Sequence, residues 1–278
     1  MHRQHPMRAP LPFSYRHNRT FVRHSQSGCD DLLPVRRTGY SEPMCGRFAM
    51  DQTVDELITE FVIVTGQQPE NWTPDWRSGY NIKPTERVAA VFESSRDGSP
   101  PVRRLEGARW SLLPGWARDA KLTYPTFNAR SETAASKATF KSSVASKRAI
   151  IPARGYYEWK TVGKTKTPFF ISEPDSPLAF AGLYSWWRAS PDEEWMLTAT
   201  ILTRQADGPL ADIHERTPVT LPPHMHDVWL DATVVGDQQL VDAAVAASRE
   251  VDLVSYEVAP LGRDADGPEL IEPLKPLF

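Results

Sequence analysis

The stretch MCGRF at residues 44–48, with a cysteine directly after a methionine, is the first feature of this chain that could carry chemistry. If the mature chain begins at Cys45, that residue has a free α-amine beside its thiol. The pKa of an α-amine is about 7.7–8.0, against about 10.4 for a lysine, so part of the amine is unprotonated at neutral pH. Such an amine can condense with an aldehyde to an imine, and the thiol can then close a five-membered thiazolidine. An internal cysteine cannot close this ring because its nitrogen is an amide, and its usual role is that of a small buried side chain.

Two further motifs contain side chains suited to proton transfer. The motif GYYEWK places Glu158 among aromatic residues on an expected strand, where a carboxylate can act as a general acid–base. The motif DIHERTPV contains His214 and Arg216, which share a face if the segment is extended. The alternatives are an exposed strand position or a structural ion pair for Glu158, and a structural role for His214.

Two more motifs contain groups that could bind nucleic acid. In FNARSET, Asn128 and Arg130 stand at the start of an expected helix, where a cation and free backbone N–H groups suit a phosphate; a plain helix cap is the alternative. In RWSLLPGWA, Trp110 and Trp116 flank a Pro-Gly turn. They would stack on bases if exposed and belong to the core if buried, and the core is the better default.

Composition limits the class of protein. The 278 residues contain 32 Lys plus Arg and 35 Asp plus Glu, for a net charge of −3. A nucleic-acid-binding protein is usually basic overall, so any DNA site here would have to be a local groove. The two cysteines, Cys29 and Cys45, do not form a disulfide framework and suit a reducing compartment. His224 and His226 have no third ligand nearby in the sequence, so we expect no metal and no cofactor.

The first 43 residues differ from the rest of the chain. They contain seven Arg, no Lys and three acidic residues, and so carry a charge of +4, while the remainder carries −7. They show no apolar periodicity and no apolar signal-peptide core. We therefore expect 1–43 to be a disordered or spurious extension and 44–278 to be one domain. A start codon placed too far upstream, an organellar transit peptide and a processed pro-segment are the possible origins.

The remaining pattern favours many strands and few helices. Helical spacing occurs at 54–63, 131–147 and 237–250. The segment 67–86 is typical of a structured loop, and 209–222 of a loop with strand character at its end. Strand patterns occur at 87–94, 102–114, 148–160, 167–173, 178–187, 194–204 and 253–259. Since no regular alternation of strands and helices appears, the sequence predicts an α+β fold with a largely antiparallel sheet flanked by short helices. No stretch approaches the roughly 20 apolar residues of a membrane helix.

Eight motifs in a fixed order give the most specific signal: MCGRF, YNIKPTE, RWSLLPGWA, FNARSET, GYYEWK, FAGLYSWW, HERTPV and DGPELIEPL. With them the chain resembles the SOS response-associated peptidase (SRAP) family, from Met44 almost to Phe278. The resemblance implies a compact α+β fold with a barrel-like sheet and a positively charged channel. It also implies a sensor of abasic sites in single-stranded DNA that crosslinks itself to them.

The resemblance carries roles to individual residues. It implies that Cys45 is the N-terminal nucleophile, that Asn128 helps to hold the abasic sugar, and that Glu158 and His214 move protons. Arg47 and Arg130 match arginines that grip DNA phosphates. Two departures from the family are visible: Thr217 stands where methionine is usual, and the cysteine is residue 45 instead of the residue after the initiator. We add three residues to the expected DNA-binding set: Trp110, Trp116 and Arg216.

These observations predict a monomeric cytoplasmic protein, associated with the nucleoid when bound to DNA, that forms a thiazolidine crosslink through Cys45. Its partner is single-stranded DNA containing abasic sites, and no membrane is involved. Two alternatives remain open. One is an N-terminal-nucleophile cysteine peptidase that acts on its own pro-segment or on other proteins. The other is a non-catalytic module that binds single-stranded DNA.

Overall fold

A computed structural model describes residues 46–51, 75–95 and 99–274. All of these residues belong to one compact unit, Ser41–Phe278. The extension 1–43, Cys45 and the helix expected at 54–63 lie outside the described residues. No helix in the described part of the chain is long and apolar enough to cross a membrane.

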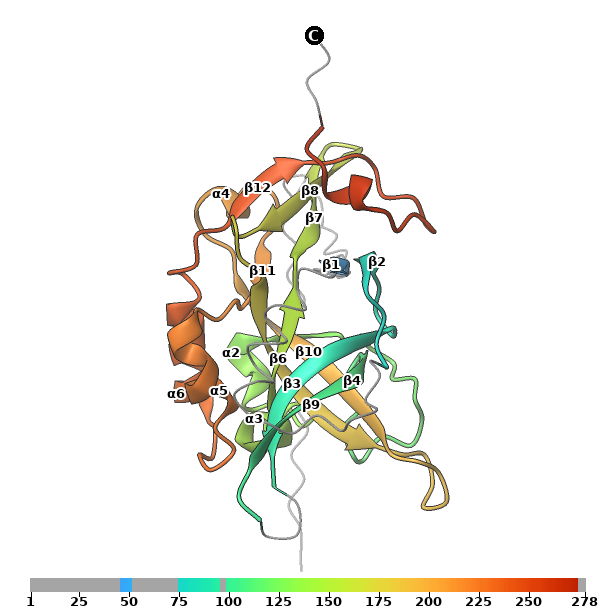
Figure 1. Ribbon diagram of the computed structural model, residues 1–278, viewed down its shortest axis with the longest axis vertical. Coiled ribbons are helices and arrows are strands. Elements are labelled where there is room, and N and C mark those ends of the chain that lie inside the picture. The colour runs from blue at the N-terminus through green and yellow to red at the C-terminus, as the bar shows by residue number, and fades with distance from the viewer. Residues whose placement is uncertain (1–45, 52–74, 96–98, 275–278) are drawn as a thin grey trace, which may run out of the picture. The chain divides into compact units, whose positions relative to one another are not determined.

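Twelve strands in the described residues form two sheets (Figure 1). One sheet has the order β12-β8-β7-β1-β2, and its strands span Val254–Glu257, Thr165–Ser172, Gly155–Val162, Phe48–Met50 and Gly79–Ile82. The other has the order β11-β10-β4-β3-β6-β9, with strands at Arg216–Pro218, Met196–Gln205, Val102–Trp110, Arg87–Ser94, Arg148–Ala153 and Leu178–Trp187. Strand β5 (Asn128–Arg130) pairs with β10.

The second sheet closes on itself because β10 pairs with both β4 and β9. Strands β10, β4, β3, β6 and β9 thus form a ring, in which the parallel contact between β10 and β4 is short and the other pairings are antiparallel. The predicted α+β fold with a mostly antiparallel sheet is confirmed. The barrel-like part is this ring of five strands and not a complete barrel.

Short helices accompany the sheets. The α-helices α2 to α6 span Ser131–Ala134, Lys141–Ser146, Gly208–Ala211, His226–Leu230 and Gln238–Ala247, and the 3-10 helices η1 and η2 span Pro223–Met225 and Pro268–Ile271. Asp237 precedes helix α6 as its N-cap: its carboxylate accepts a hydrogen bond from the N–H of Leu240 at 3.0 Å and so caps the first turn. Its buried Val241, Ala244 and Ala247 recur at helical spacing.

Three predicted elements need correction. The helix expected at 131–147 is two short helices, α2 and α3, because Thr139 and Phe140 are buried between them and Thr139 exchanges a hydrogen bond with Tyr124. The loop expected at 67–86 contains strand β2, and the segment 209–222 contains helix α4 before its strand. Tertiary packing therefore overrides the local pattern at these places.

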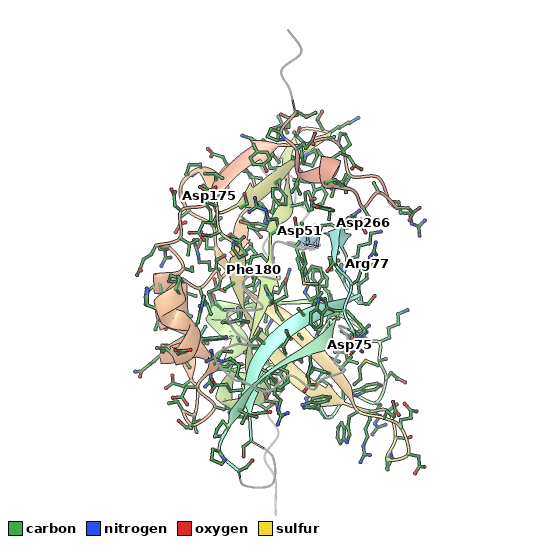
Figure 2. All side chains as sticks on the ribbon, in the orientation of Figure 1. Asp51, Asp75, Arg77, Asp175, Phe180 and Asp266 are labelled. Atoms are coloured by element: carbon green, nitrogen blue, oxygen red, sulfur yellow. The ribbon has the colours of Figure 1, made fainter. Side chains whose placement is uncertain are left out.

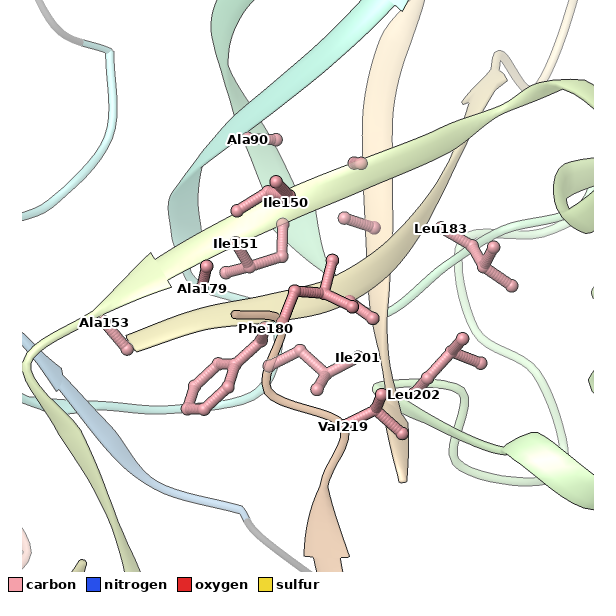
Figure 3. Packing of buried hydrophobic residues seen from close by; sticks show 14 of the residues in the cluster. Ala90, Ile150, Ile151, Ala153, Ala179, Phe180, Leu183, Ile201, Leu202 and Val219 are labelled. Atoms are coloured by element: carbon pink, nitrogen blue, oxygen red, sulfur yellow. The ribbon is translucent and has the colours of Figure 1, made fainter. Parts of the chain in front are cut away.

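The core joins the ring to the first sheet. Figure 3 shows Ile150, Ile151, Phe180 and Ile201 packed together between the strands of the ring. The phenyl group of Phe180 also packs edge-on against that of Phe48 in β1, with the two aromatic centroids 6.1 Å apart. Since Phe48 is fully buried, it anchors the start of β1 in the core, directly after Gly46 and Arg47.

Candidate active site

A pocket of about 410 Å³ lies beside strands β1 and β7. Eight residues line it: Gly46, Arg47, Pro84, Phe127, Glu158, Trp159, Lys166 and His214. They come from five regions that are far apart in the sequence, one of which is the hairpin of β7 and β8. The pocket combines three basic side chains with one carboxylate, which suits an anionic ligand that also needs proton transfer.

The pairing of β1 with β7 positions Gly46 and Arg47. Phe48 pairs with Tyr156 in antiparallel register, and the N–H of Tyr157 donates to the carbonyl of Arg47 at 3.0 Å. Continuing this register by one residue sets Gly46 opposite Glu158, and both line the pocket. Cys45 lies outside the described residues, but it directly precedes Gly46 in the chain.

Glu158 and His214 face each other in this pocket. The Glu158 side chain is 5% exposed, and its Oε1 lies 3.9 Å from Nδ1 of His214. Nδ1 of His214 also accepts a hydrogen bond from the N–H of Arg216 at 3.1 Å. The same Nδ1 lies 3.3 Å from the carbonyl of Arg216, so the backbone of Arg216 holds the imidazole in place. The structure therefore brings together the two residues expected to move protons, although 56 positions separate them in the sequence.

A relay of hydrogen bonds from the C-terminal segment holds the Arg47 side chain. Nη1 of Arg47 donates to Oδ1 of Asn81 at 2.7 Å, and Nδ2 of Asn81 donates to the carbonyl of Ala265 at 2.7 Å. Oδ1 of Asp266 accepts from the N–H of Asn81 at 2.8 Å, and Arg77 forms an ion pair with the same carboxylate. Figure 2 shows Arg77 and Asp266 beside strand β2. Asp266, the first residue of the motif DGPELIEPL, thus stabilises β2 through a hydrogen bond with its backbone.

Arg216 is placed differently from the expectation. Its side chain is only 9% exposed; Nη2 donates to Oε2 of Glu132 at 2.9 Å and to the carbonyl of Thr203 at 2.6 Å. This guanidinium holds the pKa of the Glu132 carboxyl below its usual value. We correct the predicted DNA contact: Arg216 is occupied by internal partners and supports the turn that carries His214.

The two tryptophans of RWSLLPGWA have different environments. Trp110 is fully buried, packs edge-on against Phe48 at 4.9 Å, and donates its indole N–H to the carbonyl of Phe127 at 2.8 Å. It has no face for a base, so the prediction of base stacking is wrong for Trp110. Trp116 is 57% exposed, and its stacking role stays a prediction.

Asn128 and Arg130 lie on strand β5, directly after a residue of the pocket. Phe127 lines the pocket, while Asn128 is partly buried beside it and is not among the lining residues. The Arg130 side chain is exposed at the start of α2. Helix α2 has only four residues, so its N-terminus offers little to a phosphate. The feature of this position that suits a phosphate is the charge of Arg130.

Sequence reasoning missed three contributors to the site. Asn81 and Pro84 stand in the motif YNIKPTE, whose residue types alone predict no role for either residue. Lys166 lies on β8, which pairs with β7 in a hairpin. A turn after GYYEWK would have indicated that the next strand, and Lys166 with it, lies beside β7. In the described part of the chain, no group of three or more His, Cys, Asp or Glu could hold a metal ion.

Comparisons with known proteins agree with this fold. The model of the family described as SOS response associated peptidase (SRAP) matches residues 44–261. The chain belongs to the SRAP family.

Several relatives carry a more particular name. The chain is 35% identical over 235 residues to the abasic site processing protein YoqW of Bacillus subtilis, covering 82% of this chain and 99% of that one. It is 33% identical over 241 residues to the abasic site processing protein YedK of Escherichia coli, covering 83% and 100%. A crystal structure of a protein from Bordetella bronchiseptica has a TM-score of 0.57 at 26% identity and covers 78% of this chain and 100% of that one.

Proposed function

We propose that this protein processes abasic sites in single-stranded DNA by forming a covalent thiazolidine with the lesion through Cys45 as the first residue of the mature chain. The pocket formed by Gly46, Arg47, Glu158 and His214 is the observation that carries this proposal. Membership of the SRAP family and the names of the relatives support the lesion as the substrate.

The chemistry needs an amine, a thiol and a proton shuttle. An abasic deoxyribose equilibrates between a cyclic hemiacetal and an open aldehyde. The Cys45 amine attacks the aldehyde carbon, and loss of one water leaves an imine. The thiol then adds its sulfur to the imine carbon and its proton to the nitrogen, which closes the five-membered ring. Glu158 and His214 would transfer the protons of ring opening and water loss.

The surrounding cations would hold the strand. Arg47 lines the pocket and its side chain is held by Asn81, and Arg130 is exposed at the end of β5, three residues beyond Phe127. Phosphate contacts supply most of the affinity of such proteins and make it salt-dependent. Trp116 would stack on a base, and Asn128 would contact the sugar after local adjustment.

The extension 1–43 is incompatible with this mechanism while it is attached. The Cys45 nitrogen would then be a peptide amide with no basic lone pair, and the thiol alone gives at most a reversible hemithioacetal. We therefore propose that 44–278 is the functional domain. Cys45 becomes the first residue either through translation from Met44 followed by removal of that methionine, or through cleavage before Cys45.

The experiment compares a chain that begins at Cys45 with a full-length chain whose leader is verified by intact mass. Each is mixed with single-stranded DNA containing one abasic site and analysed on a denaturing gel. We expect a shifted band only from the chain that begins at Cys45. Equal crosslinking by both chains would refute the amine mechanism.

A matched variant separates the two groups of Cys45. Cys45→Ala keeps the N-terminal amine and lacks the thiol, so it should give no stable band by itself and a band after borohydride reduction of the imine. Its non-covalent binding should stay close to that of the parent, because the phosphate contacts are unchanged. A parent that cleaves peptide amides and ignores abasic DNA would favour the peptidase alternative.

A further inference from the structure

A second pocket, of about 480 Å³, adjoins the candidate active site. Pro84 and Phe127 line both pockets, so they form the wall between them. The other lining residues are Thr85, Arg109, Ser111, Leu113 and the segment 120–126. Nothing in the mechanism above uses this second pocket.

Arg109 is the distinctive group of the second pocket. Its guanidinium is partly buried, and its one described hydrogen bond is from Nη1 to the carbonyl of Ser111 at 2.9 Å. No carboxylate among the described residues forms an ion pair with Arg109, and burial lowers the pKa of its guanidinium. A partly buried cation without a counter-charge is costly unless a ligand supplies the charge.

The remaining polar groups also suit an anion. Lys121 adds a second cation, and none of the residues that line the pocket is acidic. Ser111 and Thr126 exchange a hydrogen bond between hydroxyl groups at 2.9 Å, and the hydroxyls of Thr85 and Thr123 add further possible donors. The volume lies within the range of about 300–1,000 Å³ that is usual for ligand sites.

The turn between the two pockets is strained. Lys83 to Glu86 form a four-residue turn, closed by a hydrogen bond from the N–H of Glu86 to the carbonyl of Lys83 at 3.1 Å. Thr85 occupies its third position with φ of 78°, where a type II turn normally has glycine. A β-branched residue is unfavourable in this region. Because the Thr85 side chain is exposed, core packing does not explain the residue, whereas strain of this kind collects at ligand sites.

We propose that the second pocket binds the phosphodiester of the nucleotide next to the abasic sugar, with Arg109 as the cationic contact and the Thr85 hydroxyl at the wall. This inference rests on the proposed function, since the first pocket must hold the abasic sugar. The strand would then pass over Pro84, and one of its two flanking nucleotides would occupy the second pocket.

The test measures non-covalent affinity for single strands that carry a tetrahydrofuran abasic analogue, which has no aldehyde and cannot crosslink. Three oligonucleotides are used, with the analogue internal, at the 5′ end or at the 3′ end. Arg109→Gln should weaken binding of the internal-lesion strand about tenfold, the effect of one charge-assisted hydrogen bond. It should also reduce the slope of log K against log salt by roughly 0.7, the value for one phosphate contact on a single strand.

The end-lesion strands locate the contact. One of them lacks the nucleotide that would occupy the second pocket, and it should bind the parent and Arg109→Gln equally. Arg109→Lys keeps the charge and should restore most of the slope. Arg249→Gln is the control, because Arg249 is 54% exposed, pairs with Asp207 and lines neither pocket. Thr85→Gly should weaken binding of the internal-lesion strand without lowering the Tm, since glycine accepts a positive φ.

The outcomes separate the two proposals. A parent protein that binds no abasic strand at low salt would overturn the proposed function, and this inference with it. A parent that binds, with unchanged affinity and slope in Arg109→Gln, would overturn the second pocket alone. Equal weakening of all three oligonucleotides by Arg109→Gln would also overturn it, because the contact would then be independent of the flanking nucleotide.

Discussion

Asn81 offers a sharp test of how the site is assembled. Its side chain is buried and links two distant groups: Oδ1 accepts from Nη1 of Arg47, and Nδ2 donates to the carbonyl of Ala265, both at 2.7 Å. Asn81→Ala removes both bonds and leaves the backbone pairing of β2 with β1 in place. We expect the variant to lose stability and to release the Arg47 side chain from the pocket.

The structure sets the expected magnitude. A hydrogen bond from a charged donor contributes about 1.5–3 kcal/mol and a neutral one about 0.5–1.5 kcal/mol. The free energy of unfolding of Asn81→Ala should therefore fall by about 2–4.5 kcal/mol. For a domain of this size each kcal/mol shifts the Tm by roughly 2–4 °C, so the Tm should fall by about 4–18 °C.

A double-mutant cycle with Arg47→Ala isolates the link between the two side chains. The free energy of unfolding is measured by urea denaturation for the parent, both single variants and the double variant. Since the residues share a hydrogen bond, we expect a coupling energy above about 0.5 kcal/mol. The affinity for abasic single-stranded DNA should fall in each single variant, with little further loss in the double variant. Additive effects in both measurements would refute the view that Asn81 acts through Arg47.

Three further predictions follow from the same contacts. Glu158→Gln and His214→Ala should each slow crosslinking roughly 10²-fold, the scale of a lost general acid–base, with little change in binding to intact single strands; parental crosslinking rates in both would make them structural. Tyr156→Phe removes a buried hydroxyl that exchanges a hydrogen bond with Thr217 at 2.7 Å, and urea denaturation should show a loss of about 1 kcal/mol. The buried guanidinium of Arg216 lowers the pKa of Glu132 in the folded state. The ionised Glu132 therefore stabilises the fold at pH values above its unfolded pKa of about 4.3. This stabilisation is lost as the pH falls through the lowered pKa of the folded state. Glu132→Gln should show a shallower loss of Tm in that acidic window, and an unchanged pH profile would contradict this.

Residue types and the order of motifs were enough to predict the family, the α+β class and the chemistry available to the site. Strand β3 coincides with the predicted segment 87–94, because a short continuous apolar run between turn signals is a local property of the chain. The expectation that Glu158 and His214 act together is supported by their common pocket. An acid, a base and a thiol can be recognised from residue identity, since these groups belong to the side chains.

Burial and pairing were decided by tertiary structure. Trp110 and Trp116 share one motif, yet one is fully buried and the other is mostly exposed. Arg216 of HERTPV forms an ion pair with Glu132, 84 positions away. Asn81 donates a hydrogen bond to the carbonyl of Ala265, 184 positions away. Closure of the five-stranded ring likewise depends on β10 finding two partners. Such contacts join segments that are distant in the sequence, so local patterns carry no record of them, and they determine which charges remain available to a ligand.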